Sequence, residues 1–201
     1  DLSNITASSV TAAVDDDVYF TGTIGEAVVT VASGKTFITT AAKVTGKTIN
    51  GAGTVAITAL NGTANADLSN ITASSVTAAV DDDVTFTGTI GEAVVTVASG
   101  KTFTTTAAKV NGETLDGDGT VAITALDATA AADLSKITAA SVTAAVADDV
   151  TFTGTIGKAV VTVANTKTFT STAAKVNGET LDGDGTVAIT ALDATAAADL
   201  S

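Results

Sequence analysis

The arrangement of apolar and polar residues along the chain predicts an all-β protein. From Val84 to Ile90, apolar side chains alternate with hydroxyl side chains, and a period of two is typical of a strand with one buried face. Similar segments rich in Val, Thr and Ala lie on both sides, and Gly-bearing turns separate them. The strands expected in this part of the chain are 67–80, 84–90, 93–97, 102–106, 114–115 and 120–126.

The same text occurs three times at a spacing of 66 residues, without an insertion or deletion. The copies are residues 1–66, 67–132 and 133–198, and residues 199–201 begin a fourth. Self-similarity at a long period is typical of solenoids and of arrays of identical modules. We therefore expect each copy to be one slice of an elongated object, so that the repeats together form one continuous solenoid.

A comparison of the copies separates a predicted core from a predicted surface. Apolar residues at alternating positions recur almost unchanged, and we expect them to point inward. They are Val18/Val84/Val150, Phe20/Phe86/Phe152, Val29/Val95/Val161, Phe37/Phe103/Phe169 and Ile57/Ile123/Ile189. Substitutions fall between them, such as Tyr19 against Thr85, or Glu26 against Lys158. A position that accepts either charge is expected to face water.

The composition narrows the possible chemistry. The chain has no Pro, Cys, Met, His or Trp, and only 3% of its residues are aromatic. Disulfides, thiol chemistry, imidazole bases and the usual zinc sites are therefore excluded from this segment. Because the apolar residues are mostly Ala, Val, Ile and Leu, we expect a thin core. The lack of Pro suits a stack in which each strand donates hydrogen bonds to its neighbours.

Charge and hydropathy bear on the possible partners. The net charge of −13 repels phosphate backbones and anionic membranes, so we expect no nucleic-acid binding. Polar residues interrupt every apolar run well before the roughly 20 residues of a transmembrane helix, so no membrane insertion is expected. No signal peptide is visible, and Asp1 is in register with the later copies. We therefore expect a window of a longer array.

Two all-β architectures fit this repeat: a continuous parallel β-solenoid, or a string of small β-sandwich modules. An immunoglobulin-like sandwich needs about 100 residues, so 66 residues are few for two packed sheets. We predict a right-handed parallel β-solenoid (β-helix) built from three 66-residue repeats. Coils of roughly 22 residues would give about three rungs per repeat, on the order of 14 Å tall. Four smaller rungs also fit the length.

The segment VTFTGTIGEAVVTVASGKTFTTTAAKVNGETLDGDGTVAIT, residues 84–124, resembles the acidic tandem-repeat arrays of very large bacterial surface and secreted proteins, the adhesin-like β-solenoids. The likeness covers the whole chain and depends on composition and period. It implies an elongated, structural or adhesive molecule that is extracellular or lies at the cell surface.

Acidic turns are the candidate metal sites. An EF-hand loop counted from Asp116 would need Gly at its sixth position and Glu at its twelfth, where this chain has Val121 and Asp127. The first copy has Asn50 and Ala52 in place of the two turn carboxylates. We interpret the acidic turns as solvated turns, with weak calcium sites as the alternative, and expect no other cofactor. The candidate ligands are Asp81, Asp82, Asp83, Asp116, Asp118, Asp182 and Asp184.

Three hypotheses for function follow. The first is a structural segment of a long bacterial filament or adhesin, acting as spacer, stalk or self-associating fibre. Its partners would be further copies of the repeat, joined end to end or laterally, because open strand edges pair readily. The second is an ice- or polysaccharide-binding solenoid that uses rows of Thr such as Thr85 and Thr87. The third is a calcium-dependent β-sandwich adhesin array. Catalysis is not expected, because the acidic residues recur in every copy.

Overall fold

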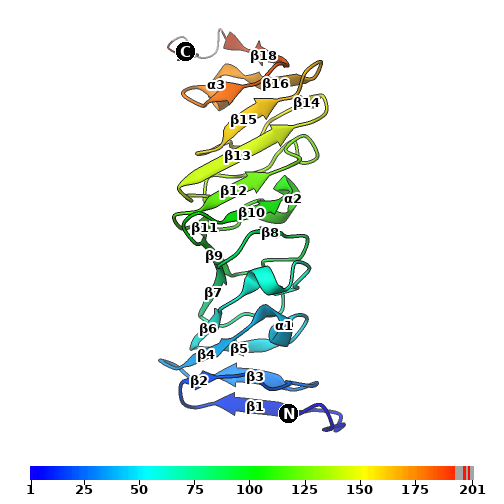
Figure 1. Cartoon of the computed structure of the whole chain (residues 1–201), viewed down its shortest axis with the longest axis vertical. Coiled ribbons are helices and arrows are strands. Elements are labelled where there is room, and N and C mark those ends of the chain that lie inside the picture. Colours follow the sequence, from blue (N-terminus) through cyan, green and yellow to red (C-terminus); the bar gives the residue numbers. More distant parts are fainter. Residues whose placement is uncertain (193–196, 198, 200–201) are drawn as a thin grey trace.

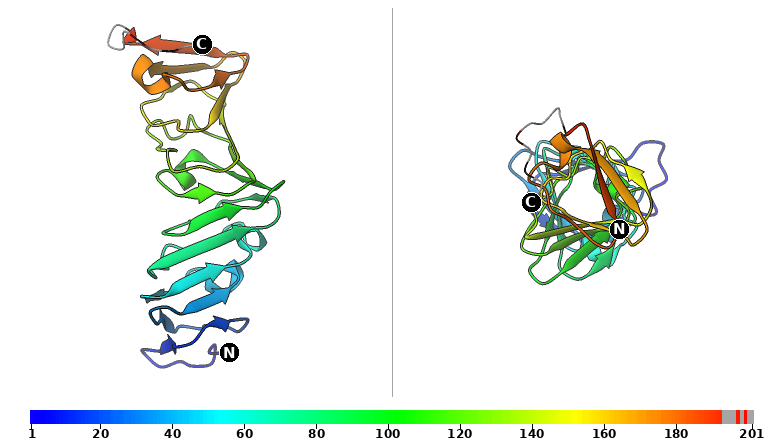
Figure 2. Two further views of the ribbon diagram at one scale, coloured as in Figure 1. Left: turned by 90° about the vertical axis from the view of Figure 1, so that its left-hand side faces the viewer. Right: turned by 90° about the horizontal axis from the view of Figure 1, so that it is seen from above.

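The computed structural model describes residues 1–192, 197 and 199. The chain is a mostly β rod, and its two ends lie at opposite ends of that rod (Figure 1). Viewed along the rod, the strands wind around a single axis (Figure 2). Of the expected fourth copy, Asp199 is described, whereas Leu200 and Ser201 lie outside the described residues.

Within the described residues, each repeat contributes six strands and a one-turn helix. Repeat 1 contains β1 (Thr11–Val14), β2 (Val18–Tyr19), β3 (Val28–Val31), β4 (Thr36–Thr39), α1 (Ala41–Val44), β5 (Ile49–Gly51), β6 (Thr54–Ile57) and the 3₁₀ turn η1 (Leu60–Gly62). Repeat 2 contains β7 (Ser75–Val80), β8 (Val84–Thr85), β9 (Val94–Val97), β10 (Thr102–Thr105), α2 (Ala107–Val110), β11 (Leu115–Asp116) and β12 (Thr120–Ile123). Repeat 3 contains β13 (Ser141–Val146), β14 (Val150–Thr151), β15 (Val160–Val163), β16 (Thr168–Thr172), α3 (Ala173–Val176), β17 (Leu181–Asp182) and β18 (Thr186–Thr190).

Every strand pairing in the described part of the chain is parallel. The sheets have the strand orders β1-β3-β5, β2-β4-β6-β7-β9-β11, β8-β10-β12-β13-β15-β17 and β14-β16-β18. This arrangement confirms the predicted parallel β-solenoid, which has about ten turns. The β-sandwich alternative is wrong, because each strand pairs with the next turn of the same coil and not with an antiparallel neighbour.

The number of turns per repeat is not an integer. Along one sheet, three turns lead from Val18 through Phe37 and Val55 to Val76, a span of 58 residues. Eight more residues reach Val84, the copy of Val18. Each repeat therefore makes three turns and about a third of another, and the copy of β1 in the second repeat, β7, lies in the sheet that β2 begins.

The predicted core lies inside the coil. In β9 and β10 the buried residues alternate with less buried ones, as a period of two requires. Phe86 and Phe103 stack on consecutive turns with ring centroids 5.3 Å apart, and the other repeats contain the same pair. Thr105 is also buried, and its hydroxyl donates to the Phe86 carbonyl at 2.9 Å. A polar group is thus tolerated inside the coil because it has a partner.

Several predicted strands are shorter in the structure: 120–126 ends at Ile123, and two others lose more than half of their length. Of residues 84–90, only Val84–Thr85 form a strand, although the Phe86 amide still donates to the Thr104 carbonyl at 2.7 Å. Of residues 67–80, only Ser75–Val80 form a strand, and Asp67 and Ile71 make isolated bridges. These segments turn the corners of the coil, where a strand cannot continue.

The one-turn helices were not predicted from the sequence. In α2, Ala107 and Val110 are buried and Lys109 lies in the last turn. Ala has a high helix propensity, and its small side chain allows a turn of helix to fit at a corner of the coil. In the described part of the chain, no helix is long and apolar enough to cross a membrane.

Candidate functional site

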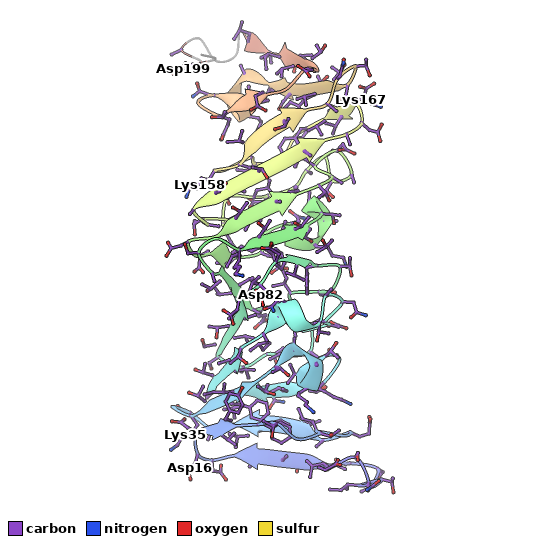
Figure 3. All side chains as sticks on the ribbon, viewed as in Figure 1. Asp16, Lys35, Asp82, Lys158, Lys167 and Asp199 are labelled. Carbon is purple, nitrogen blue, oxygen red and sulfur yellow. The ribbon has the colours of Figure 1, made fainter. Side chains whose placement is uncertain are left out.

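The acidic run of each repeat, residues 81–83 in repeat 2, links one turn of the coil to the next by an ion pair and a hydrogen bond. Asp82 forms an ion pair with Lys101 at 2.7 Å, and the carboxylate of Asp83 accepts a hydrogen bond from the Thr102 amide at 2.8 Å (Figure 3). The hydrogen bond that Lys101 donates to Asp82, together with the negative charge of that carboxylate, raises the pKa of Lys101. Because the partner lies one turn ahead, these carboxylates stabilise the stacking of loops.

The other repeats make the same contacts. Asp16 pairs with Lys35 at 2.9 Å, and Asp148 pairs with Lys167 at 2.6 Å (Figure 3). The first residue of the run differs, because Ala147 replaces the Asp81 of repeat 2. At this position the contact between turns is made by the backbone amide. The Asp81 amide donates to the Asn61 side chain at 3.0 Å, and the Ala147 amide donates to the Asp127 side chain at 2.8 Å. Because the donor is a main-chain amide, this contact remains when Ala147 replaces the aspartate.

The second acidic turn, residues 116–119, is shaped by its glycines. A Cβ on Gly117, whose φ is +100°, would lie 2.3 Å from the Val97 carbonyl oxygen of the preceding turn. The first copy keeps both glycines of this turn and loses both carboxylates. The turn therefore needs glycine for close approach, whereas its carboxylates are replaceable.

The candidate metal ligands do not gather into one site. Asp118, Asp182 and Asp184 are exposed, while Asp116 is half-buried with one side-chain oxygen that meets no hydrogen-bond donor. Within residues 1–192, 197 and 199, no three carboxylates lie close enough together to hold a metal ion. Asp81, Asp82 and Asp83 take part in, or lie beside, the contacts between turns.

Some of the rows of outward-facing Thr residues are interrupted by other side chains. On one sheet the neighbours across successive turns are Thr85, Thr104, Ala122, Thr143 and Val160. The equivalent row at the start of the rod begins with Tyr19, Ile38 and Ala56, and Tyr19 is 62% exposed. These two rows are therefore interrupted, whereas the adjoining row of Thr102, Thr120 and Ser141 keeps a hydroxyl on each of three successive turns.

One edge of the coil differs in charge between repeats. Repeat 1 places Lys47 3.7 Å from Glu26 one turn earlier. The corresponding residues are Glu92 and Glu113 in repeat 2, and Lys158 and Glu179 in repeat 3. Burial raises the pKa of Glu113, and the nearby Lys136 charge acts in the opposite direction. Burial also raises the pKa of Glu179.

The ammonium group of Lys158 is held by main-chain carbonyls. It donates to the Ala139 carbonyl at 2.7 Å and to the Thr138 carbonyl at 3.4 Å (Figure 3). Glu92 occupies this position in repeat 2 and has no proton to donate when ionised. This edge is therefore the part of the surface where the repeats differ most in their contacts.

The N-terminal end face contains a mostly apolar hollow. It is lined by Leu2, Ala12, Val14, Val18, Phe20 and Ile24. In the middle of the rod, the preceding repeat covers the equivalent residues: Phe86 is 1% exposed, and a Cβ on Gly88 would lie 2.0 Å from the Ala66 carbonyl oxygen. Sequence reasoning did not identify this face or the glycines beside it, although the unchanged Thr-Gly-Thr of each copy is a signal that could have led to them.

In comparisons with known proteins, no family model, no curated protein and no solved structure matches the chain.

Proposed function

We propose that this chain is a structural segment of a long extracellular or cell-surface bacterial filament or adhesin, where it acts as a spacer or stalk. The observation that carries the proposal is the continuity of the backbone sheets through both joints between repeats. At the first joint β6 pairs with β7 over four residues, and at the second β12 pairs with β13 over four residues. A rod built in this way lengthens in proportion to the number of copies.

The contacts of the charged residues support a mechanical role. Ion pairs between Asp and Lys connect consecutive turns of the coil, and the same ion pair recurs in every repeat. A catalytic site would occur once, whereas a contact that maintains a stack is needed at each turn. The interruption of one hydroxyl row by Ala122 and Val160 also favours a spacer over a surface that binds polysaccharide or ice.

The test is to join further 66-residue copies to the chain and to measure its length by small-angle X-ray scattering. About 3.3 turns per repeat at about 4.8 Å per turn predict a rod that grows by roughly 16 Å per copy. Growth of roughly 35 to 45 Å per copy, as expected for separate sandwich-sized beads, would contradict the proposal.

Ice binding is tested separately by thermal hysteresis. We expect none, because Ala122 and Val160 interrupt the row of hydroxyls.

Calcium dependence is tested by melting the protein with and without EDTA. We expect the same melting temperature in both, since lysines and main-chain amides already pair with the Asp side chains of the acidic runs.

A further inference from the structure

We propose that Asn61 is a site of spontaneous deamidation, at which the Asn61–Gly62 pair forms a cyclic imide and then aspartate or isoaspartate. The chain contains four Asn-Gly pairs, at residues 50–51, 61–62, 111–112 and 177–178. Glycine has no side chain to hinder the approach of its nitrogen to the preceding side-chain amide, so each pair is a candidate. The four pairs differ in how the fold holds them. This modification goes beyond the proposed spacer function and does not depend on it.

The reaction needs only water as a co-reactant. The Gly62 amide nitrogen gives its proton to solvent and attacks the side-chain carbonyl carbon of Asn61, so that a new C–N bond forms. The bond from this carbon to the side-chain nitrogen then breaks, and ammonia leaves. Water opens the resulting five-membered ring at either carbonyl, which gives aspartate or isoaspartate. Gly62 is exposed, so solvent reaches the reacting atoms.

The side-chain carbonyl of Asn61 is polarised by the next turn of the coil. Its oxygen accepts a hydrogen bond from the Asp81 amide at 3.0 Å. Negative charge develops on this oxygen when the Gly62 nitrogen attacks, and a fixed N–H donor stabilises such charge. The contact that joins the two turns therefore also favours the reaction.

The attacking nitrogen distinguishes this pair from the pair in repeat 2. The Gly62 amide donates to the Ala59 carbonyl at 3.3 Å within the short turn η1, which is longer than the usual range of about 2.7 to 3.2 Å. The Gly112 amide donates to the Asp133 carbonyl at 2.8 Å, and the Asp133 amide donates to the Asn111 side chain at 2.7 Å. In repeat 2, one residue of the next turn thus holds both reacting groups.

The other two pairs are also held by neighbouring turns. The Gly178 amide donates to the Asp199 carbonyl at 3.1 Å, and the Asp199 amide donates to the Asn177 side chain at 2.7 Å. The pair 50–51 lies in β5, which is paired with β3, and the Asn50 side chain accepts from the Thr30 hydroxyl at 3.0 Å. At these three pairs the reaction requires local opening of the coil, which slows it.

The aspartate product fits the joint between repeats. Repeat 2 has Asp127 where repeat 1 has Asn61, and the Asp127 carboxylate accepts from the Ala147 amide at 2.8 Å. An aspartate at position 61 therefore keeps the contact with the next turn. Isoaspartate, which has one more carbon in the main chain, displaces it. Each event also adds a negative charge beside the acidic run 81–83.

The experiment is to incubate the folded 201-residue chain at mildly alkaline pH and to locate deamidation by peptide mapping with tandem mass spectrometry. We expect Asn61 to react at least about tenfold faster than Asn111, the effect on a rate of roughly one additional hydrogen bond that must break. In guanidinium chloride the four pairs should react at similar rates, because the fold no longer holds them. Equal rates at Asn61 and Asn111 in the folded chain would overturn the proposal, as would an unchanged Asn61 while the unfolded chain is modified.

The first variant is Gly62→Ala, which introduces the residue that repeat 2 has at this position, Ala128. The new methyl group hinders the attack, and we expect deamidation of Asn61 to slow by at least about tenfold. No heavy atom lies within 4 Å of the new Cβ, so the circular dichroism spectrum should not change. Deamidation of Asn61 at the native rate in this variant would contradict the proposal.

The second variant transfers the pair to the other joint. Asp127→Asn together with Ala128→Gly places an Asn-Gly pair where the Ala147 amide supplies the same hydrogen bond. We expect a second reactive site at position 127. Asp127→Asn alone is the matched control and should react at least about tenfold more slowly, because Ala128 hinders the attack. A transferred pair that is as inert as this control would refute the role of the joint.

Discussion

The first and second repeats have nearly the same sequence but different surroundings. Val84 and Phe86 of repeat 2 are buried beneath repeat 1, whereas Val18 and Phe20 are half-buried in repeat 1, the first repeat of the described chain. Within each repeat the local contacts are alike: the ring centroids of Phe20 and Phe37 are 5.3 Å apart, as are those of Phe86 and Phe103. The comparison shows that a repeat of this protein completes its core only with a neighbour, as in other solenoids.

The largest effect is expected from truncating the aromatic core. We expect Phe86→Ala to lower the free energy of unfolding by about 3 to 5 kcal/mol, because a buried ring is lost and a cavity remains. Phe20→Ala should cost roughly half as much, because its ring is already partly exposed. Urea denaturation followed by circular dichroism measures both. Equal losses would mean that the joint adds nothing to the burial of Phe86.

The next effect concerns the glycine of the joint. Gly88→Ala places a Cβ against a backbone carbonyl, and we expect a loss of about 3 kcal/mol, the upper end of the usual cost of overpacking. Gly22→Ala should cost less than about 1 kcal/mol, because it displaces only an aromatic ring at the open end. Thermal melting of the two variants at low protein concentration compares them. A Gly88→Ala variant as stable as Gly22→Ala would refute the close approach at the joint.

A smaller effect is expected at the charged edge. Glu92→Lys introduces into repeat 2 the residue that repeat 3 has at this position, where Lys158 donates to main-chain carbonyls. The substitution also replaces two charges of the same sign, Glu92 and Glu113, by a pair of opposite sign. Surface charge pairs contribute about 0.2 to 1 kcal/mol, so we expect a gain in stability of that size. Glu26→Lys is the control and should destabilise, because it removes the partner of Lys47.

The smallest effect is a dependence on pH. Hydrogen bonds from the Ser135 hydroxyl and amide lower the pKa of Asp133, and Ser69 acts in the same way on Asp67. A lowered pKa in the folded state contributes stability above the unfolded-state pKa, and this contribution is lost as the pH falls through the folded-state pKa. Burial raises the pKa of Glu113, so its protonation at falling pH acts in the opposite direction.

We therefore expect Asp133→Asn to reduce the loss of melting temperature between neutral and acidic pH, and Glu113→Gln to increase it slightly. Melting temperatures measured from about pH 7 down to about pH 3, which spans the usual carboxyl range, report both changes. If Asp133→Asn melts with an unchanged pH profile, the Ser135 contact does not stabilise the folded state.

The sequence was most informative about the strands, where the spacing of apolar residues over a few positions indicates the structure. Short segments rich in Val, Thr and Ala between Gly-bearing turns identified the strands around Val95, Phe103 and Val121, and the recurrence of apolar residues identified the core. It was less informative at the corners of the coil. Residues 86–90 have the alternation of a strand, but Gly88 and Gly91 lie where the chain turns or approaches a neighbouring carbonyl. Alternation reports which face is buried and does not report where a strand ends.

The candidate site was predictable only in part. The acidic runs could be located from the sequence, but their Lys and amide partners lie 19 residues further on, a separation set by the length of one turn. The function of Gly88 and Gly154 was not predictable, because it depends on carbonyls 22 residues earlier in the chain. Such contacts become visible only when the register of the coil is known.

By itself, the sequence determined that the chain is a repetitive all-β protein with a thin aliphatic core and an acidic surface. Side-chain alternation and the 66-residue period are local or periodic properties, and both can be read directly from the order of residues. Only the tertiary structure decided that each repeat advances by three turns and a third, so that β7 continues the sheet that β2 begins. Turn length depends on how corners pack against neighbouring turns, and that packing exists only after the coil has formed.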